Sequence, residues 1–300
     1  MNRQYNFSVI FGGTMSDRTA VKEIIKHELN NLIDKISDDF KKNYKRKSHN
    51  WILNGFDETL VANMVFVSSF ESKYGNMFET IAKNIAKLKY GEENVPSVFQ
   101  GAGVSDKEFK EFKASYTGNQ QVIISKIDLS ACQDTIAGIV QFNKAQGKGK
   151  SRIPCSLDSN RLKEIHKNNF SKTRLNQQPI DLGIYDPNED IYRIFEIKAG
   201  GDLDSRKAPG DVAKMLTEYT ALGKDNSEIY FATLYHKDGE GNIWTGIVKR
   251  YLSEDLILIG SKFWEFVLKD TSFNEFKSIY NEAFKELEIS SKINELIKSI

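Results

Sequence analysis

The sequence has 300 residues, 40% of them hydrophobic and 28% charged, which is ordinary for a globular protein with a sizeable core. Lysine and arginine number 42 against 41 aspartate and glutamate residues, so the net charge gives no bulk attraction to phosphate or lipid. Cys132 and Cys155 lack the spacing of a zinc ribbon or a disulfide framework. Neither a secretion signal nor a membrane-length apolar window is found. We therefore expect a soluble, cytoplasmic protein with no membrane partner.

Helical periodicity dominates the first part of the chain. Ser16 is a plausible N-cap, and apolar residues follow at helical spacing as far as Phe40, which predicts one long helix. That helix runs into the basic cluster 41–47, which suits either a solvated helix end or a phosphate contact. A second helix is predicted over 76–89, after Gly75.

The later segments predict an α/β arrangement. Branched residues indicate a strand over 121–129, and glycines and cations indicate a mobile basic loop over 145–153. Further elements are predicted downstream: strands at 179–186, 191–199, 228–235 and 242–251, a helix at 209–222, and helices over 261–299. The expected fold is α/β, a mixed central β-sheet flanked by helices, with N- and C-terminal helical elaborations. We expect one domain over 1–300, mainly helical over 1–120, with an α/β core over 121–260 and C-terminal helices over 261–300.

The most informative segment is a predicted hairpin over 180–198. If 187–190 form a four-residue loop, the strands pair so that Asp181 lies opposite Glu196. Cross-strand partners have Cβ atoms about 4.5–5.5 Å apart, so the two carboxylates repel each other unless a cation such as Mg²⁺ lies between them. Lys198 shares a face with Glu196, while the residues between and before them point into the core.

Two carboxylates, a metal and a lysine are sufficient in kind for phosphodiester hydrolysis. A bound metal polarises the phosphate and lowers the pKa of a bound water. The ammonium of Lys198 either orients that water or stabilises developing negative charge, and the sequence leaves both roles open.

Ile180-Asp181 followed by Glu196-Ile197-Lys198 resembles the PD-(D/E)XK nuclease motif, with isoleucine in place of its proline. The resemblance implies that Asp181 and Glu196 bind Mg²⁺ and that Lys198 completes the catalytic set. The run 199–222 is similar to the segment after the catalytic lysine in type II restriction endonucleases, especially a TdeIII-like group whose members cut GGNCC. Glu79 matches a helix glutamate that often joins this catalytic set.

The resemblance implies a type II restriction endonuclease that cuts double-stranded DNA at a short, palindromic sequence. A homodimer is expected, because two-fold symmetry presents one active site to each strand. A cognate DNA methyltransferase would be the functional partner, in a bacterial or archaeal cytoplasm. The alternatives are a repair or junction nuclease of the same fold and a non-catalytic DNA-binding module.

Several of these residues also have simpler interpretations. Asp181, Glu196 and Lys198 would otherwise form a solvated strand face, and Glu79 an exposed helix position. In the basic loop, Lys148, Lys150 and Arg152 fit either contacts to DNA phosphates or a solvated loop. Before the predicted helix 209–222, a second group fits either a phosphate or the surroundings of the metal, or else a polar turn that caps the helix: Asp202, Asp204, Arg206 and Lys207. The string GKGKS lacks the first glycine of a Walker A motif, and the four histidines have no zinc-site spacing.

Overall fold

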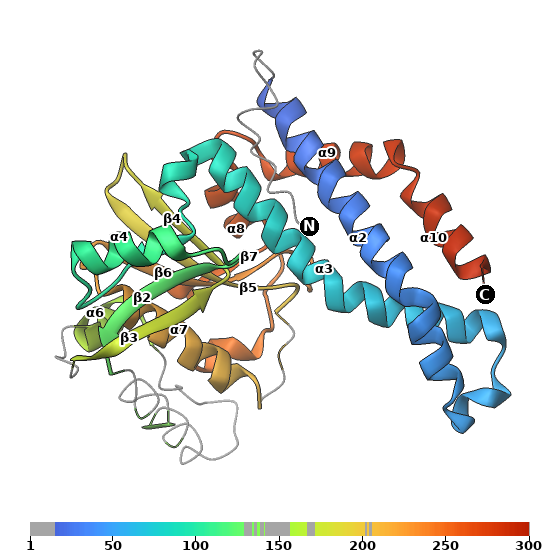
Figure 1. Cartoon of the computed structure of the whole chain (residues 1–300), viewed down its shortest axis with the longest axis horizontal. Helices are drawn as coiled ribbons and strands as arrows, with labels where there is room; N and C mark the ends of the chain where they lie inside the picture. The colour runs from blue at the N-terminus through green and yellow to red at the C-terminus, as the bar shows by residue number, and fades with distance from the viewer. Residues whose placement is uncertain are drawn as a thin grey trace. The chain divides into compact units, whose positions relative to one another are not determined.

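The computed structural model describes residues 16–128, 134, 137, 138, 141, 157–166, 172–201, 203 and 206–299 (Figure 1). The chain divides into two compact units. We call Met1–Ile85 with Asp270–Ile300 the helical unit and Ala86–Lys269 the sheet unit. Among the described residues, no helix is both long enough and apolar enough to cross a membrane.

The helical unit is built around the predicted N-terminal helix. This helix, α2 (Asp17–Ser48), starts after Ser16, whose side chain accepts a hydrogen bond from the backbone of Thr19, so the predicted cap is confirmed. Its apolar side is buried, and α2 packs against α9 (Phe273–Glu286) and α10 (Ile289–Lys298). Lysine and arginine side chains on α2 pair with Glu282 and Glu286 of α9.

The prediction that a helix begins near Gly75 is wrong. After the short helix η1 (Trp51–Gly55), α3 runs without interruption over Glu58–Tyr90. Aromatic rings spaced four residues apart contact one another along its surface, from Phe66 through Phe70 and Tyr74 to Phe78. A glycine inside a helix costs only about 1 kcal/mol relative to alanine, so these packing contacts outweigh it.

The sheet unit contains two mixed sheets flanked by helices, which confirms the predicted fold class. In the first sheet, with order β1-β2-β3, β1 is parallel and β3 antiparallel to β2. In the second, with order β4-β5-β6-β7, β4 is antiparallel to β5 and the other neighbours are parallel. The strands are β1 (Val98–Gln100), β2 (Gln121–Ile127), β3 (Lys172–Ile180), β4 (Leu182–Asp186), β5 (Ile191–Lys198), β6 (Ser227–Thr233) and β7 (Ile257–Ile259). The helices are α4 (Asp106–Ser115), α6 (Ser159–His166), α7 (Ala208–Leu222) and α8 (Ser261–Leu268), with short turns η2 (Glu92–Asn94), η3 (Ile247–Arg250) and η4 (Glu254–Leu256).

Two predicted strands differ from the observed ones. The strand expected over 179–186 is split at Asp181, because β3 ends in the first sheet and β4 begins in the second. Residues 242–251, all of them described, form no strand, and β7 takes the place beside β6. The ring of Trp244 packs on Phe231 and folds over Gly246, where an added Cβ would lie 1.9 Å from it. Such a fold requires a bent chain rather than an extended one.

The helix α7 and the side chain of Gln121 each contact both sheets. The helix α7, predicted over 209–222, packs against β2 and β3 of the first sheet and against β5 and β6 of the second. The buried amide of Gln121 on β2 donates a hydrogen bond to the carbonyl of Gly183 on β4 (3.0 Å) and accepts one from its N–H (2.9 Å). The chain on either side of Asp181 is therefore held in place.

Candidate active site

Asp181 lies at the break between β3 and β4. The strands β4 and β5 pair in the predicted register, with Asp186 opposite Ile191 and Leu182 opposite Phe195. The next step of this register places Asp181 opposite Glu196, although the ladder itself ends at Leu182. The carboxylate of Asp181 instead accepts a hydrogen bond from the backbone N–H of Ile197 at 2.8 Å, which fixes it beside β5.

Glu196 and Lys198 lie on one face of β5, as predicted. Their side chains meet, with Lys198 Nζ donating to Glu196 Oε1 at 2.6 Å. Phe195 and Ile197 are buried on the opposite face, where Phe195 packs edge-on against Phe263 of α8. The side chain of Glu196 is 0% exposed and that of Lys198 is 28% exposed, so the face is not a solvated one.

The helix α7 brings three more ionisable side chains to the same place. Lys214 Nζ donates to Asp181 Oδ1 at 3.0 Å and also to Glu196 Oε2. Asp211 lies 3.2 Å from Lys198 Nζ, and Glu218 lies 3.5 Å from Lys214 Nζ. We call these six residues the active-site cluster: Asp181, Glu196, Lys198, Asp211, Lys214 and Glu218.

The three helix residues were missed in the sequence analysis. Their spacing of three and then four residues places them on one face of α7, because such positions are neighbours on a helix surface. That face looks like an ordinary solvated one in the sequence, but Glu218 is 0% exposed. The available sequence signal was a set of ionisable residues at helical spacing on the helix that follows the predicted catalytic strand.

Burial and crowding perturb the pKa values of the cluster. Burial, reinforced by the charge of Asp181, raises the pKa of Glu196. Burial and the charge of Glu196 raise the pKa of Glu218 well above its ordinary range. For Lys214, burial opposes protonation, but the carboxylates of Glu218, Asp181 and Glu196 outweigh it and raise its pKa. Lys198, whose pKa the charge of Glu196 raises against the effect of burial, and Lys214 therefore stay protonated. Glu196 and Glu218 ionise less readily than exposed glutamates.

The donor chemistry of the cluster fits a divalent ion that prefers oxygen. When all groups are ionised, four carboxylates face two ammonium groups, which leaves two negative charges uncompensated. Neither oxygen of Glu218 accepts a hydrogen bond from the described residues. Among the described residues, no three histidine, cysteine, aspartate or glutamate side chains are arranged to hold a metal ion together. Mg²⁺ does not require three protein ligands, because it keeps several waters and binds through one or two carboxylates.

The roles of the other predicted site residues stay predictions. Glu79 is half-buried on α3 within the helical unit, and its catalytic role stays a prediction. Arg206 and Lys207 are exposed just before α7, and their DNA contacts also stay predictions. The remaining predicted residues lie outside the described residues: Lys148, Lys150, Arg152, Asp202 and Asp204.

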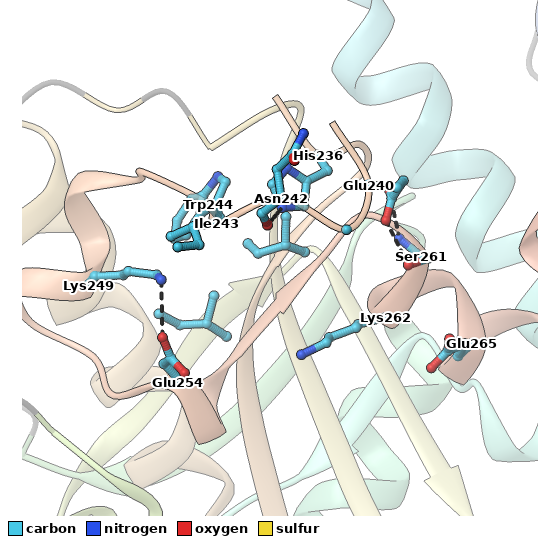
Figure 2. Close-up of a pocket in the computed structure, with 13 residues that line it drawn as sticks. His236, Glu240, Asn242, Ile243, Trp244, Lys249, Glu254, Ser261, Lys262 and Glu265 are labelled. Atoms are coloured by element: carbon cyan, nitrogen blue, oxygen red, sulfur yellow. Dashed lines mark hydrogen bonds and ion pairs between the residues drawn. The ribbon is translucent and has the colours of Figure 1, made fainter. Parts of the chain in front are cut away.

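A separate pocket of about 530 Å³ lies in the sheet unit alongside β7 and the segment that follows β6 (Figure 2). Lys249 pairs with Glu254, and Ser261 donates to Glu240, across parts of its wall, as Figure 2 shows. Its lining includes three glutamates and two lysines and none of the active-site cluster. This charge balance does not favour a phosphate, and we assign the pocket no role.

A model of the family described as "Type II restriction endonuclease, HinfI" matches residues 17–283, which include all six residues of the active-site cluster. The chain belongs to the HinfI family of type II restriction endonucleases. Membership in the HinfI family confirms the predicted class of enzyme, a DNA hydrolase of a restriction system, and implies binding of double-stranded DNA. The relation to a TdeIII-like group stays a prediction. No curated protein and no solved structure matches this chain.

Proposed function

We propose that this HinfI-family protein is a Mg²⁺-dependent PD-(D/E)XK endonuclease that hydrolyses phosphodiester bonds at a short palindromic sequence. Asp181 and Glu196 would bind the metal, and Lys198 would be the third catalytic residue. The observation that carries the proposal is the meeting of Asp181, Glu196 and Lys198 where β4 and β5 begin to separate, with Glu196 fully buried. A solvated strand face would not bury these charges, because an unpaired buried charge is strongly destabilising.

The residues of the cluster have distinct tasks in this reaction. A divalent ion held by Asp181 and Glu196 would polarise the phosphate and acidify a bound water. Lys198 would donate hydrogen bonds to the phosphate or to the attacking water as negative charge develops. Asp211, 3.2 Å from Lys198 Nζ, would hold that ammonium in position, and the N–H of Ile197 would orient Asp181.

The remaining parts of the proposal concern the partners. We infer a homodimer, because a palindromic site presents two equivalent strands to two equivalent active sites. A cognate methyltransferase would protect host sites without a physical contact to this chain. The basic residues Lys148, Lys150, Arg152, Arg206 and Lys207 would contact the DNA backbone and make binding steeply salt-dependent. Glu79 would join the metal site directly or through water.

The test is cleavage of a long duplex DNA by the purified protein, with Mg²⁺ or with EDTA, followed by sequencing of the fragment ends. We expect discrete fragments that share one end sequence and require Mg²⁺. Lys198→Ala should abolish them, whereas Lys163→Ala, a change at an exposed lysine on α6, should cut like the wild type. A smear would indicate a repair-type nuclease, and no cleavage would indicate a binding module.

A further inference from the structure

The cation that holds Asp181 and Glu196 together in this structure belongs to the protein itself. Lys214 Nζ donates to one oxygen of Asp181 at 3.0 Å and to Glu196 Oε2, so it bridges the two proposed metal ligands. Lys214 reaches this point from α7 and is not part of the hairpin that carries the carboxylates. A divalent ion cannot bind the same two oxygens while the ammonium remains between them.

Lys214 has a second partner, one helical turn away. Glu218 follows it by four residues on α7, and its Oε1 lies 3.5 Å from the same ammonium. Glu218 is 0% exposed, and its oxygens accept no hydrogen bond from the described residues. A lysine that turned fully toward Glu218 would satisfy a buried carboxylate that is poorly satisfied in this structure. The flexible four-carbon stem of lysine permits such a move.

Lys198 does not share this freedom, because it is held on the other side of Glu196. It donates to Glu196 Oε1 rather than Oε2, at 2.6 Å, and its second carboxylate partner is Asp211 at 3.2 Å. The two oxygens of Glu196 are thus divided between two lysines. Departure of Lys214 frees Glu196 Oε2 and Asp181 Oδ1 and leaves Lys198 in place for the reaction.

We propose that Lys214 is an exchangeable internal cation, which bridges Asp181 and Glu196 in the metal-free enzyme and transfers to Glu218 when a divalent ion binds. The inference rests on the proposed metal site at Asp181 and Glu196. Lys214 is accordingly a positioning residue, which preserves the arrangement of the metal ligands without metal and competes with the metal for them. Glu218 is the acceptor that makes the exchange favourable.

The experiment measures Mg²⁺ binding by calorimetry in the absence of DNA, so that cleavage plays no part. Lys214→Met should bind Mg²⁺ at least about tenfold more tightly than the wild type, because a competing charge is removed. In EDTA it should melt at a lower temperature, because the two carboxylates then repel each other, and Mg²⁺ should restore the melting temperature. Lys163→Met is the matched control and should change neither quantity. Equal or weaker Mg²⁺ binding by Lys214→Met would overturn the proposal.

A second variant tests the acceptor, and a lack of effect in the wild-type background would contradict the exchange even if Lys214→Met does not fold. Glu218→Gln preserves the shape of the side chain but removes the acceptor charge, so it should weaken Mg²⁺ binding. The exchange predicts that this weakening shrinks in the Lys214→Met background, because no ammonium then needs an acceptor. An equal weakening in both backgrounds, or none in the wild-type background, would contradict the exchange.

Asp181→Asn separates this proposal from the proposed function. If Asp181→Asn removes Mg²⁺ binding but the Lys214 and Glu218 variants behave like the wild type, the metal site stands and the exchange is wrong. If Asp181→Asn binds Mg²⁺ normally, the metal site itself is wrong.

Discussion

The β4–β5 hairpin carries a group of buried charges at each end, and the two groups differ in how their charges are satisfied. At the loop end, Arg193 pairs with Asp186, Glu189 and Glu228, which we call the Arg193 cluster. At the other end lies the active-site cluster. Both groups have more carboxylates than cations, so the number of charges alone does not distinguish them.

The Arg193 cluster is closed around a fixed cation. The guanidinium donates from Nε to Glu228 at 3.0 Å, from Nη1 to Asp186 at 3.3 Å and from Nη2 to Glu189, and it lies over the ring of Phe266. Glu189 and Glu228 are 56% and 37% exposed, so water screens their excess charge. Such a planar, fork-shaped cation suits a structural role.

The active-site cluster is open by comparison. Its most buried carboxylates, Glu196 and Glu218, have no exposure to water, and its cations are lysines with flexible stems. The Arg193 cluster completes its hydrogen bonds within the protein, whereas the proposed catalytic cluster keeps buried carboxylates that a further cation could neutralise. Four measurements test that distinction.

Asp181→Asn should have the largest effect, on cleavage. Removal of one charge from the proposed metal pair should lower the cleavage rate at saturating DNA by at least about 100-fold, because metal and transition-state stabilisation are lost together. Thermal unfolding in EDTA should be little changed, since the metal-free cluster already has excess negative charge. A variant that cleaves within threefold of the wild-type rate would contradict the assignment of Asp181.

Arg193→Met should have its main effect on stability. A buried cation that loses its place among carboxylates typically costs about 3–5 kcal/mol, which denaturant unfolding at neutral pH would measure. The folded fraction should still bind Mg²⁺ with wild-type affinity, because the Arg193 cluster lies at the other end of the hairpin. Loss of Mg²⁺ binding in this folded fraction would show that the two clusters are not independent.

Glu218→Gln should change how stability depends on pH. The pKa of Glu218 is raised in the folded state by burial, so the folded protein binds this proton more tightly than the unfolded chain. In EDTA, the wild type should therefore lose stability relative to Glu218→Gln as the pH rises above about 4.5, the ordinary pKa of the group. Unfolding curves from pH 5 to 8 would measure this difference, and a difference that stayed constant would contradict the burial of an ionisable Glu218.

Tyr230→Phe should have the smallest effect. The hydroxyl of Tyr230 donates to Glu228 at 2.9 Å, at the outer edge of the Arg193 cluster. Loss of one such hydrogen bond costs about 1 kcal/mol in unfolding free energy, because Glu228 remains half-exposed and paired with Arg193. A loss comparable to that of Arg193→Met would mean that the cluster is less closed than its geometry indicates.

Local sequence was sufficient to predict the hairpin, because its register depends on a four-residue turn and on alternation along two short strands. The loop 187–190 pairs Asp186 with Ile191, and this register brings Asp181, Glu196 and Lys198 together. The N-cap at Ser16 was predictable for the same reason, since a cap involves only the next few residues.

The features that sequence reasoning missed depend on distant parts of the chain. The break at Asp181 exists because β3 pairs with β2 while β4 pairs with β5. No local sequence pattern indicates which strands will pair. The alternation over 242–251 resembles a strand, but Trp244 packs on Phe231 instead. Lys214 and Glu218 look like solvated helix positions until α7 packs with that face toward β5.

The break at Asp181 also has a mechanical consequence. The residue before Asp181 pairs with one sheet and the residue after it with the other, while Glu196 belongs wholly to the second sheet. The distance between the two proposed metal ligands therefore depends on how the two sheets are aligned. The hydrogen bonds between Gln121 on β2 and Gly183 on β4 help to fix that alignment. A shift of one sheet relative to the other would therefore move Asp181 relative to Glu196 and change the distance between the two proposed metal ligands.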